Sequence, residues 1–194
     1  MGDEVTGQSS VELTVDGEHR TITYREGSSL MQALRDNRID SVLNGCSEGV
    51  CGACNVLNED TGGVVRSCLF PADRFDGAEL TTAAGLVDDE TGELHPVQAA
   101  FLDHGAAQCG FCIPGMMVSA AKLLRENDDP TREEIASALN GNICRCTGYV
   151  QQFDAVEDAA ARIRGETETS EQSSAVTDGG CPGCDCGFGG ESDE

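Results

Sequence analysis

The sequence predicts an α+β fold in which a small mixed domain comes first and a set of helices follows. Residues 11–15 and 21–24 alternate apolar and polar side chains on either side of Asp16-Gly17, a pattern typical of a β-hairpin. From Leu86 onward the apolar residues recur at helical spacing instead. This change of pattern indicates two domains.

The N-terminal domain is predicted to hold strands around one helix. Ser28 or Ser29 can cap a helix that carries Leu30, Met31 and Leu34 on one side. Residues 56–57 and 64–65 flank a turn-forming segment at 58–63, which predicts a second hairpin. We assign residues 10–84 to this domain.

Four helices are predicted in the second domain, to which we assign residues 85–165. Pro96 can begin the first, which ends at Gly105, and residues 116–126 form the next. The pair Thr131-x-x-Glu134 is a capping box for a third helix that stops at Gly141, and the fourth runs from Tyr149. Residues 166–194 are rich in Glu, Ser and Thr, which predicts an acidic, disordered tail.

A first set of four cysteines has the spacing Cys46-x4-Cys51-x2-Cys54-x13-Cys68. Three ligands in one loop and a fourth standing alone is the pattern of a plant-type [2Fe–2S] centre. Structural zinc sites also use four cysteines, but they usually pair two short knuckles. The three-plus-one layout therefore favours iron and sulfide at this set.

A second set, Cys109-x2-Cys112-x31-Cys144-x-Cys146, is arranged two plus two. Spacing alone leaves zinc and an iron–sulfur cluster at about even odds here. The first pair lies just before a predicted helix with Pro114 in its first turn, where free N–H groups and the helix dipole favour negative charge. That placement suits an anionic cluster, although it suits any thiolate-rich site.

The residues around both sets resolve this choice through a resemblance. The ordered motifs are G-C-S-E-G-V-C-G-A-C at 45–54, R-S-C-L at 66–69, Q-C-G-F-C-I-P-G-M at 108–116 and C-R-C-T-G-Y at 144–149. Residues 10–163 thereby resemble the small iron–sulfur subunit of the molybdenum hydroxylases, the xanthine dehydrogenase, aldehyde oxidase and carbon monoxide dehydrogenase family.

The resemblance implies a ferredoxin-like β-grasp domain with one [2Fe–2S] cluster, followed by a four-helix domain with another. It also implies an electron-transfer role, with molybdopterin on a large partner subunit and FAD on a medium one, in a heterotrimer or its dimer. Gln108 and Cys146 match positions that lie against the molybdopterin in relatives. The substrate is set in the large subunit, so we expect no catalytic residue in this chain.

An alternative of another class is a non-redox interaction module stabilised by zinc. The remaining candidates favour structural roles: Met116 and Met117 as core residues, and His95 and His104 as exposed or capping residues of a short helix. Cys181, Cys184 and Cys186 lie outside the family pattern. Three thiols in six residues could bind zinc or assist a redox partner, but we favour a mobile tail with free thiols.

The charge balance excludes some partners. The chain has 35 acidic and 12 basic residues, a net charge of −23, and Lys122 as its single lysine. Such a surface repels nucleic acid and anionic lipid. A well-solvated acidic protein would show the same balance, but the scarcity of lysine favours adaptation to a salt-rich cytoplasm. No apolar run predicts a signal peptide or a membrane span, so we expect a cytoplasmic protein whose cysteines bind metal rather than form disulfides.

Overall fold

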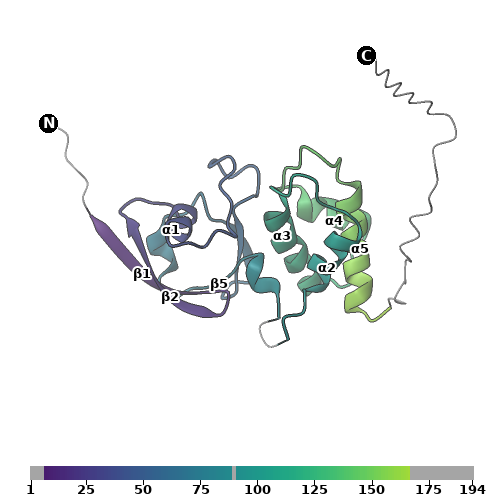
Figure 1. The fold of residues 1–194 in the computed structure, drawn as a ribbon, viewed down its shortest axis with the longest axis horizontal. Coiled ribbons are helices and arrows are strands. Elements are labelled where there is room, and N and C mark those ends of the chain that lie inside the picture. Colours follow the sequence, from purple (N-terminus) through teal and green to yellow (C-terminus); the bar gives the residue numbers. More distant parts are fainter. Residues whose placement is uncertain (1–6, 89–90, 167–194) are drawn as a thin grey trace, which may run out of the picture.

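The computed structural model describes residues 7–88 and 91–166, and they form two units that lie side by side (Figure 1). The first is a mixed five-stranded sheet with strand order β2-β1-β5-β3-β4. Its strands are β1 (Gln8–Val15), β2 (Glu18–Arg25), β3 (Asn55–Asn58), β4 (Gly63–Arg66) and β5 (Glu79–Thr81).

Both predicted hairpins are present in the sheet. β1 and β2 run antiparallel with Val11 opposite Ile22, and β3 and β4 run antiparallel with Val56 opposite Val65. The first turn works because Asp16 and Gly17 both adopt positive φ, 52° and 77°, as a two-residue hairpin turn requires. The sequence patterning missed β5, a three-residue strand that pairs parallel to β1 and antiparallel to β3.

One helix, α1 (Leu30–Asp36), packs against the sheet. Its N-terminus is capped by Ser29, whose hydroxyl accepts a hydrogen bond from the Gln32 N–H at 3.2 Å. The fully buried Leu30 and Leu34 join Leu13 and Ile22 of the sheet in the core of this unit. A short 3-10 segment, η1 (Ala72–Phe75), completes that core, and η2 (Ala84–Leu86) leads out of the sheet.

Four helices make the second unit, as the periodicity predicts: α2 (Pro96–Asp103), α3 (Ile113–Glu126), α4 (Arg132–Leu139) and α5 (Val150–Ile163). The predicted Thr131–Glu134 capping box forms at the start of α4. His95 caps α2, because its Nδ1 accepts from the Val97 N–H at 3.2 Å. α3 begins at Ile113, before the predicted range 116–126, with Cys112 as its N-cap and with Pro114 in its first turn as predicted.

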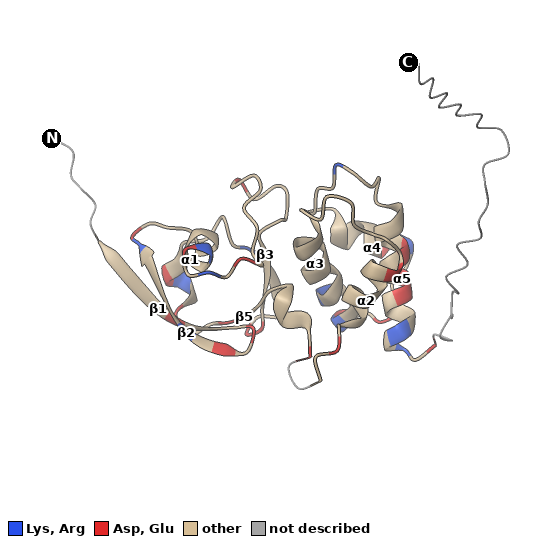
Figure 2. Cartoon of the chain, viewed as in Figure 1, with Lys and Arg blue, Asp and Glu red and all other residues tan. Residues whose placement is uncertain are grey.

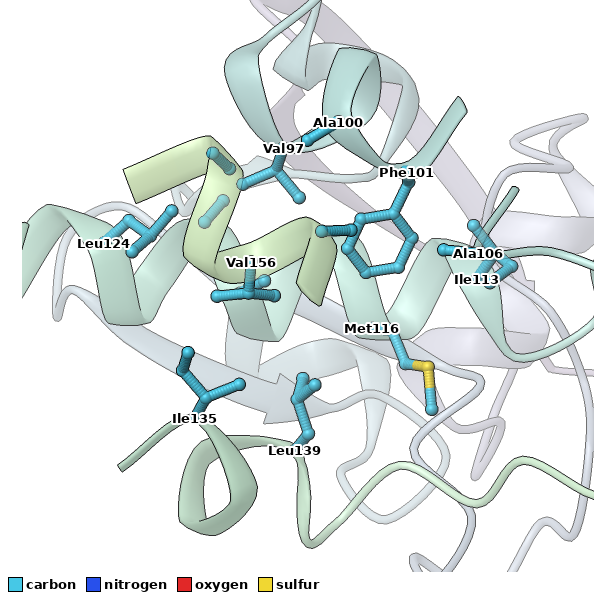
Figure 3. Close-up of a cluster of buried hydrophobic side chains, with 14 of the residues drawn as sticks. Val97, Ala100, Phe101, Ala106, Ile113, Met116, Leu124, Ile135, Leu139 and Val156 are labelled. Atoms are coloured by element: carbon cyan, nitrogen blue, oxygen red, sulfur yellow. The ribbon is translucent and has the colours of Figure 1, made fainter. Parts of the chain in front are cut away.

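The core of the helical unit draws side chains from all four of these helices (Figure 3). Phe101 from α2, Met116 from α3, Ile135 from α4 and Val156 from α5 are each no more than 2% exposed. The core role predicted for Met116 is therefore confirmed. The packing of α2–α5 fixes where the connections between them lie.

α3 lies against β3 and joins the two units. Leu57 and Val118 share a small apolar cluster with Ala83, and the Asn55 side-chain amide donates to the Ser119 hydroxyl at 3.0 Å. These contacts make one continuous body of the two units. The proposed domain limits at residues 84 and 165 stay a prediction. The tail proposed for 166–194 also stays a prediction, because residues 167–194 lie outside the described part of the chain. Among the described residues, no helix is both long and apolar enough to cross a membrane.

Candidate metal centres

The first cysteine set lies at the connection between α1 and β3, with its last member just after β4. Three backbone N–H groups point at the sulfur of Cys46: those of Glu48 at 3.3 Å, Val50 at 3.4 Å and Cys51 at 3.4 Å. In return, the Cys46 N–H donates to the sulfur of Cys51 at 3.4 Å. The loop therefore wraps around its own sulfur atoms.

This wrapping stabilises negative charge on sulfur. The N–H groups of Glu48, Cys51 and Val50 lower the pKa of Cys46 to about 6. The wrap also requires glycine at position 45, where a Cβ would lie 2.6 Å from the Cys51 sulfur. N–H donors around thiolate sulfur stabilise the negative charge of an iron–sulfur cluster and help to set its reduction potential.

Cys54 and Cys68 form the other half of this set. Cys54 is buried next to β3, and its thiol lies near enough to that of Cys68 to disfavour the Cys68 thiolate. Burial and the contact with Cys54 raise the pKa of Cys68 to about 11, although the Gly49 N–H opposes this. Buried thiols of this kind lose their protons when a metal cation binds them.

The second set joins two distant connections of the helical unit. Cys109 and Cys112 lie directly before α3, and Cys144 and Cys146 lie between α4 and α5. The sulfur atoms of Cys109 and Cys146 are 3.5 Å apart, and both residues are exposed. The fold thus brings Cys109 and Cys112 next to Cys144 and Cys146, although 31 residues separate the two pairs in the sequence.

The inner pair of the second set is Cys112 and Cys144, whose thiols lie near enough to affect each other's pKa. Burial, reinforced by Cys144, raises the pKa of Cys112 to about 12. Burial also disfavours the Cys144 thiolate, but hydrogen bonds from the Thr147 hydroxyl and nearby backbone N–H groups lower its pKa overall. The set is therefore made of an exposed pair, Cys109 and Cys146, and an inner pair in which Cys112 is buried and Cys144 is partly buried.

Sequence reasoning missed two supporting side chains, Thr147 and Tyr149. The Thr147 hydroxyl lies 3.0 Å from the Cys144 sulfur. The Tyr149 hydroxyl accepts from the Cys144 N–H at 2.8 Å and donates to the Asn142 carbonyl at 3.1 Å. Their place within three residues of Cys146 was the available signal, but only the folded structure shows that both contact Cys144.

The eight thiols lie in four pairs: Cys46–Cys51, Cys54–Cys68, Cys109–Cys146 and Cys112–Cys144. Within residues 7–88 and 91–166, no three His, Cys, Asp or Glu side chains converge as a single metal ion would require. Paired thiols fit a two-iron cluster, because each iron takes two protein ligands. The residues present therefore fit two [2Fe–2S] clusters.

The other predicted site residue, Gln108, is exposed and precedes the exposed Cys109. Cys146, the second residue predicted to face the pterin, is exposed beside Cys109. Cys181, Cys184 and Cys186 lie outside the described residues.

Comparison with known proteins identifies both units. Residues 13–76 match the 2Fe-2S iron-sulfur cluster binding domain family, and residues 82–157 match the [2Fe-2S] binding domain family. The nicotine 6-hydroxylase small subunit of Paenarthrobacter nicotinovorans is 44% identical over 154 residues, which cover 79% of this chain and 90% of that subunit. The chain belongs to the small iron–sulfur subunits of the molybdenum hydroxylases.

Solved structures agree with this family. The quinoline 2-oxidoreductase of Pseudomonas putida 86 superposes with a TM-score of 0.74 at 37% identity, covering 82% of this chain and 99% of the matched chain. The aldehyde oxidoreductase of Desulfovibrio desulfuricans gives a TM-score of 0.75 at 44% identity over 82% of this chain, but only 18% of its own length. The predicted ferredoxin-like and helical domain order is confirmed. The chain is an electron-transfer subunit of an oxidoreductase, it holds two [2Fe–2S] clusters, and it works with partner subunits.

Proposed function

We propose that this chain connects a molybdopterin site on a large partner subunit with FAD on a medium partner subunit, or with an external acceptor. When bound, each [2Fe–2S] cluster accepts and releases one electron at a time. The observation that carries the proposal is the pairing of eight thiols in two separate centres. The substrate class is a property of the large subunit and does not follow from this chain.

We assign the first cluster to Cys46, Cys51, Cys54 and Cys68, and the second to Cys109, Cys112, Cys144 and Cys146. The thiol pairs indicate how ligands share the irons: Cys46 with Cys51 and Cys54 with Cys68 in the first, Cys109 with Cys146 and Cys112 with Cys144 in the second. The chain's own role at these centres is to hold the thiolates and to donate N–H groups to them.

The decisive experiment is metal and sulfide analysis of the anaerobically purified chain with visible and electron paramagnetic resonance (EPR) spectra. Two [2Fe–2S] centres correspond to about four irons and four acid-labile sulfides per chain. Cys51→Ala should remove one spectroscopic species and keep the other, whereas Cys186→Ala, outside both sets, should keep both. Zinc in place of iron would instead support the interaction-module alternative.

We place the molybdopterin-bearing subunit against the exposed end of the second set. Cys109 and Cys146 are exposed, and the segments that carry the second set also hold three exposed apolar residues, Phe111, Ile143 and Val150. Exposed apolar side chains beside a redox centre suit a partner that excludes water from it. The medium subunit would then complete a heterotrimer or its dimer, as in the family resemblance.

Gln108 is proposed to contact the pterin together with Cys146, because its amide can both donate and accept hydrogen bonds. In the assembled complex, Gln108→Ala should slow reduction of the clusters by substrate while the iron content stays normal. Gln32→Ala, on α1 of the other unit, is the matched control. Unchanged reduction kinetics for Gln108→Ala would refute this contact.

The acidic surface is proposed to be an adaptation to a salt-rich cytoplasm. Asp and Glu residues spread over both units, while Lys122 is the single lysine (Figure 2). Salt screens their mutual repulsion, with a Debye length of about 3 Å at 1 M. A cytoplasmic location agrees with cysteines that serve as metal ligands. Thermal unfolding across a KCl series tests the adaptation, because stability should rise with salt.

The segment after Gly165 is proposed to be dispensable. Its Glu, Ser and Thr residues offer little apolar surface to offset the entropy of ordering them, and neither ligand set needs its three cysteines. Truncation after Gly165 should leave both clusters, assembly and turnover intact. A third metal equivalent that disappears on truncation would show instead that the tail binds metal.

A further inference from the structure

The two cysteine sets meet at a backbone contact between glycines. Gly52 lies between Cys51 and Cys54 of the first set, and Gly115 lies three residues after Cys112, in the first turn of α3. A Cβ on Gly115 would be 2.0 Å from the Gly52 carbonyl oxygen and 2.9 Å from its carbon. Only a residue without a side chain allows this approach.

Gly52 is constrained on its other side as well. Its φ is +71°, and a Cβ there would be 2.3 Å from the Gly141 carbonyl oxygen. Gly141 begins the segment that leads to Cys144. The peptide of Gly52 is thus enclosed by the two segments of the helical unit that carry the second cysteine set.

Hydrogen bonds hold this contact closed. The Ile143 N–H donates to the Cys51 carbonyl at 2.9 Å, and the side-chain amide of Asn142 donates to the Gly52 carbonyl at 3.4 Å. Asn142 is only 2% exposed. One helical turn further on, Ser119 accepts from the Asn55 amide at 3.0 Å and donates to the Gly115 carbonyl at 3.0 Å.

We propose that the Gly52–Gly115 contact is the positioning element that sets the separation of the two metal centres, and with it the coupling between them. This rests on the proposed assignment of the eight cysteines to two clusters. Electron transfer and magnetic coupling both weaken steeply with distance. Gly52 and Gly115 would therefore control transfer between the centres without supplying a ligand to either.

Gly115→Ala tests the contact selectively. Alanine is a better helix former than glycine by about 1 kcal/mol, so α3 itself is not weakened. The new methyl group must move from 2.0 Å to the 3.4 Å of ordinary contact with the Gly52 oxygen, a shift of about 1.4 Å. Because the methyl group is fixed to the backbone of α3 and the oxygen belongs to the backbone between Cys51 and Cys54, neither atom can rotate away, and the shift separates the two sets.

The measurement is the dipolar coupling between the two reduced centres of the full chain, followed by EPR relaxation, together with iron and sulfide content. We expect Gly115→Ala to keep about four irons and to lose part of the coupling. Gly63→Ala is the matched control, because its Cβ would be at an ordinary 3.4 Å from the Thr61 hydroxyl. Unchanged coupling at full iron content in Gly115→Ala would overturn the proposal.

Ser119→Ala decides the case in which Gly115→Ala loses iron. It removes the hydrogen bond between Asn55 and α3 without adding an atom, and it lies seven positions beyond Cys112. A smaller loss of coupling with both centres retained supports the proposal, and an unchanged coupling refutes it. A wild-type chain with fewer than two iron–sulfur centres would instead refute the proposed function.

Discussion

The two metal centres are built in different ways. The first collects three of its four cysteines in the single loop 46–54, where backbone N–H groups of the loop itself contact sulfur. The second joins two connections across Cys112-x31-Cys144, and side chains of the second connection, Thr147 and Tyr149, hold Cys144. The first centre depends on local loop conformation, whereas the second depends on the packing of four helices.

Removal of metal should produce the largest difference between the units. A bound cluster ties the two connections of the helical unit together, so its loss releases more chain entropy there than in the loop at 46–54. We expect amide hydrogen exchange in α4 and α5 of the metal-free chain to rise far more than in β1 and β2. Equal increases in hydrogen exchange in both units would show that the second centre does not depend on its metal more than the first does.

Shortening one side chain in the core of the helical unit should disturb the second centre and leave the first unchanged. Phe101 is 2% exposed in that core, so Phe101→Ala should lower the free energy of unfolding by about 3–5 kcal/mol. The neighbouring Leu102 is 67% exposed, and Leu102→Ala should change the free energy of unfolding by no more than about 0.5 kcal/mol. EPR spectra of the reduced chain should show the second species weakened in Phe101→Ala. If the first species weakened instead, the core would not be what supports the second centre.

A smaller effect is expected from Tyr149→Phe, which keeps the ring but removes the hydroxyl group that bonds Cys144 and Asn142. Leaving these backbone groups unpaired should lower the free energy of unfolding by about 1–3 kcal/mol. Redox titration should show a shifted potential for the second centre and an unchanged one for the first. Phe153→Leu, which alters the ring contact with Tyr149 but not its hydrogen bonds, is the control. A second-centre potential equal in Tyr149→Phe and in the wild-type chain would show that the Tyr149 hydroxyl does not affect that potential.

The smallest effect concerns pH and the helical unit. Burial, reinforced by the charge of Arg125, lowers the pKa of His95, whose neutral ring caps α2. The unfolded chain takes up this proton near pH 6.5 but the folded chain does so only at lower pH, so stability falls as the pH drops below about 6.5. His95→Asn keeps a capping side chain without a titrating group, and its unfolding free energy should fall less over the same range. Parallel pH profiles for the two proteins would exclude His95 as a contributor.

Sequence by itself predicted what is encoded locally. The Asp16-Gly17 turn, the Thr131–Glu134 capping box and the spacing of Cys46, Cys51 and Cys54 each depend on residues close in the chain, and periodicity gave all four helices of the second unit. Ordered motifs around both cysteine sets also predicted the family. These features need no knowledge of distant contacts, because nearby residues impose their geometry.

Tertiary structure alone decided what depends on residues far apart. β5 has only three residues, too few for a pattern, and it forms because β1 and β3 supply its partners. The pairing of Cys109 with Cys146 requires the packing of α2–α5, and the turn of Tyr149 onto Cys144 requires a positive φ of 70° at a tyrosine. The Gly52–Gly115 contact joins residues of different units. From the sequence, Gly115 is an ordinary helix residue, but the carbonyl oxygen of Gly52, 63 positions away, leaves no room for a side chain there. Close packing between distant segments imposes that requirement, and no local pattern records it.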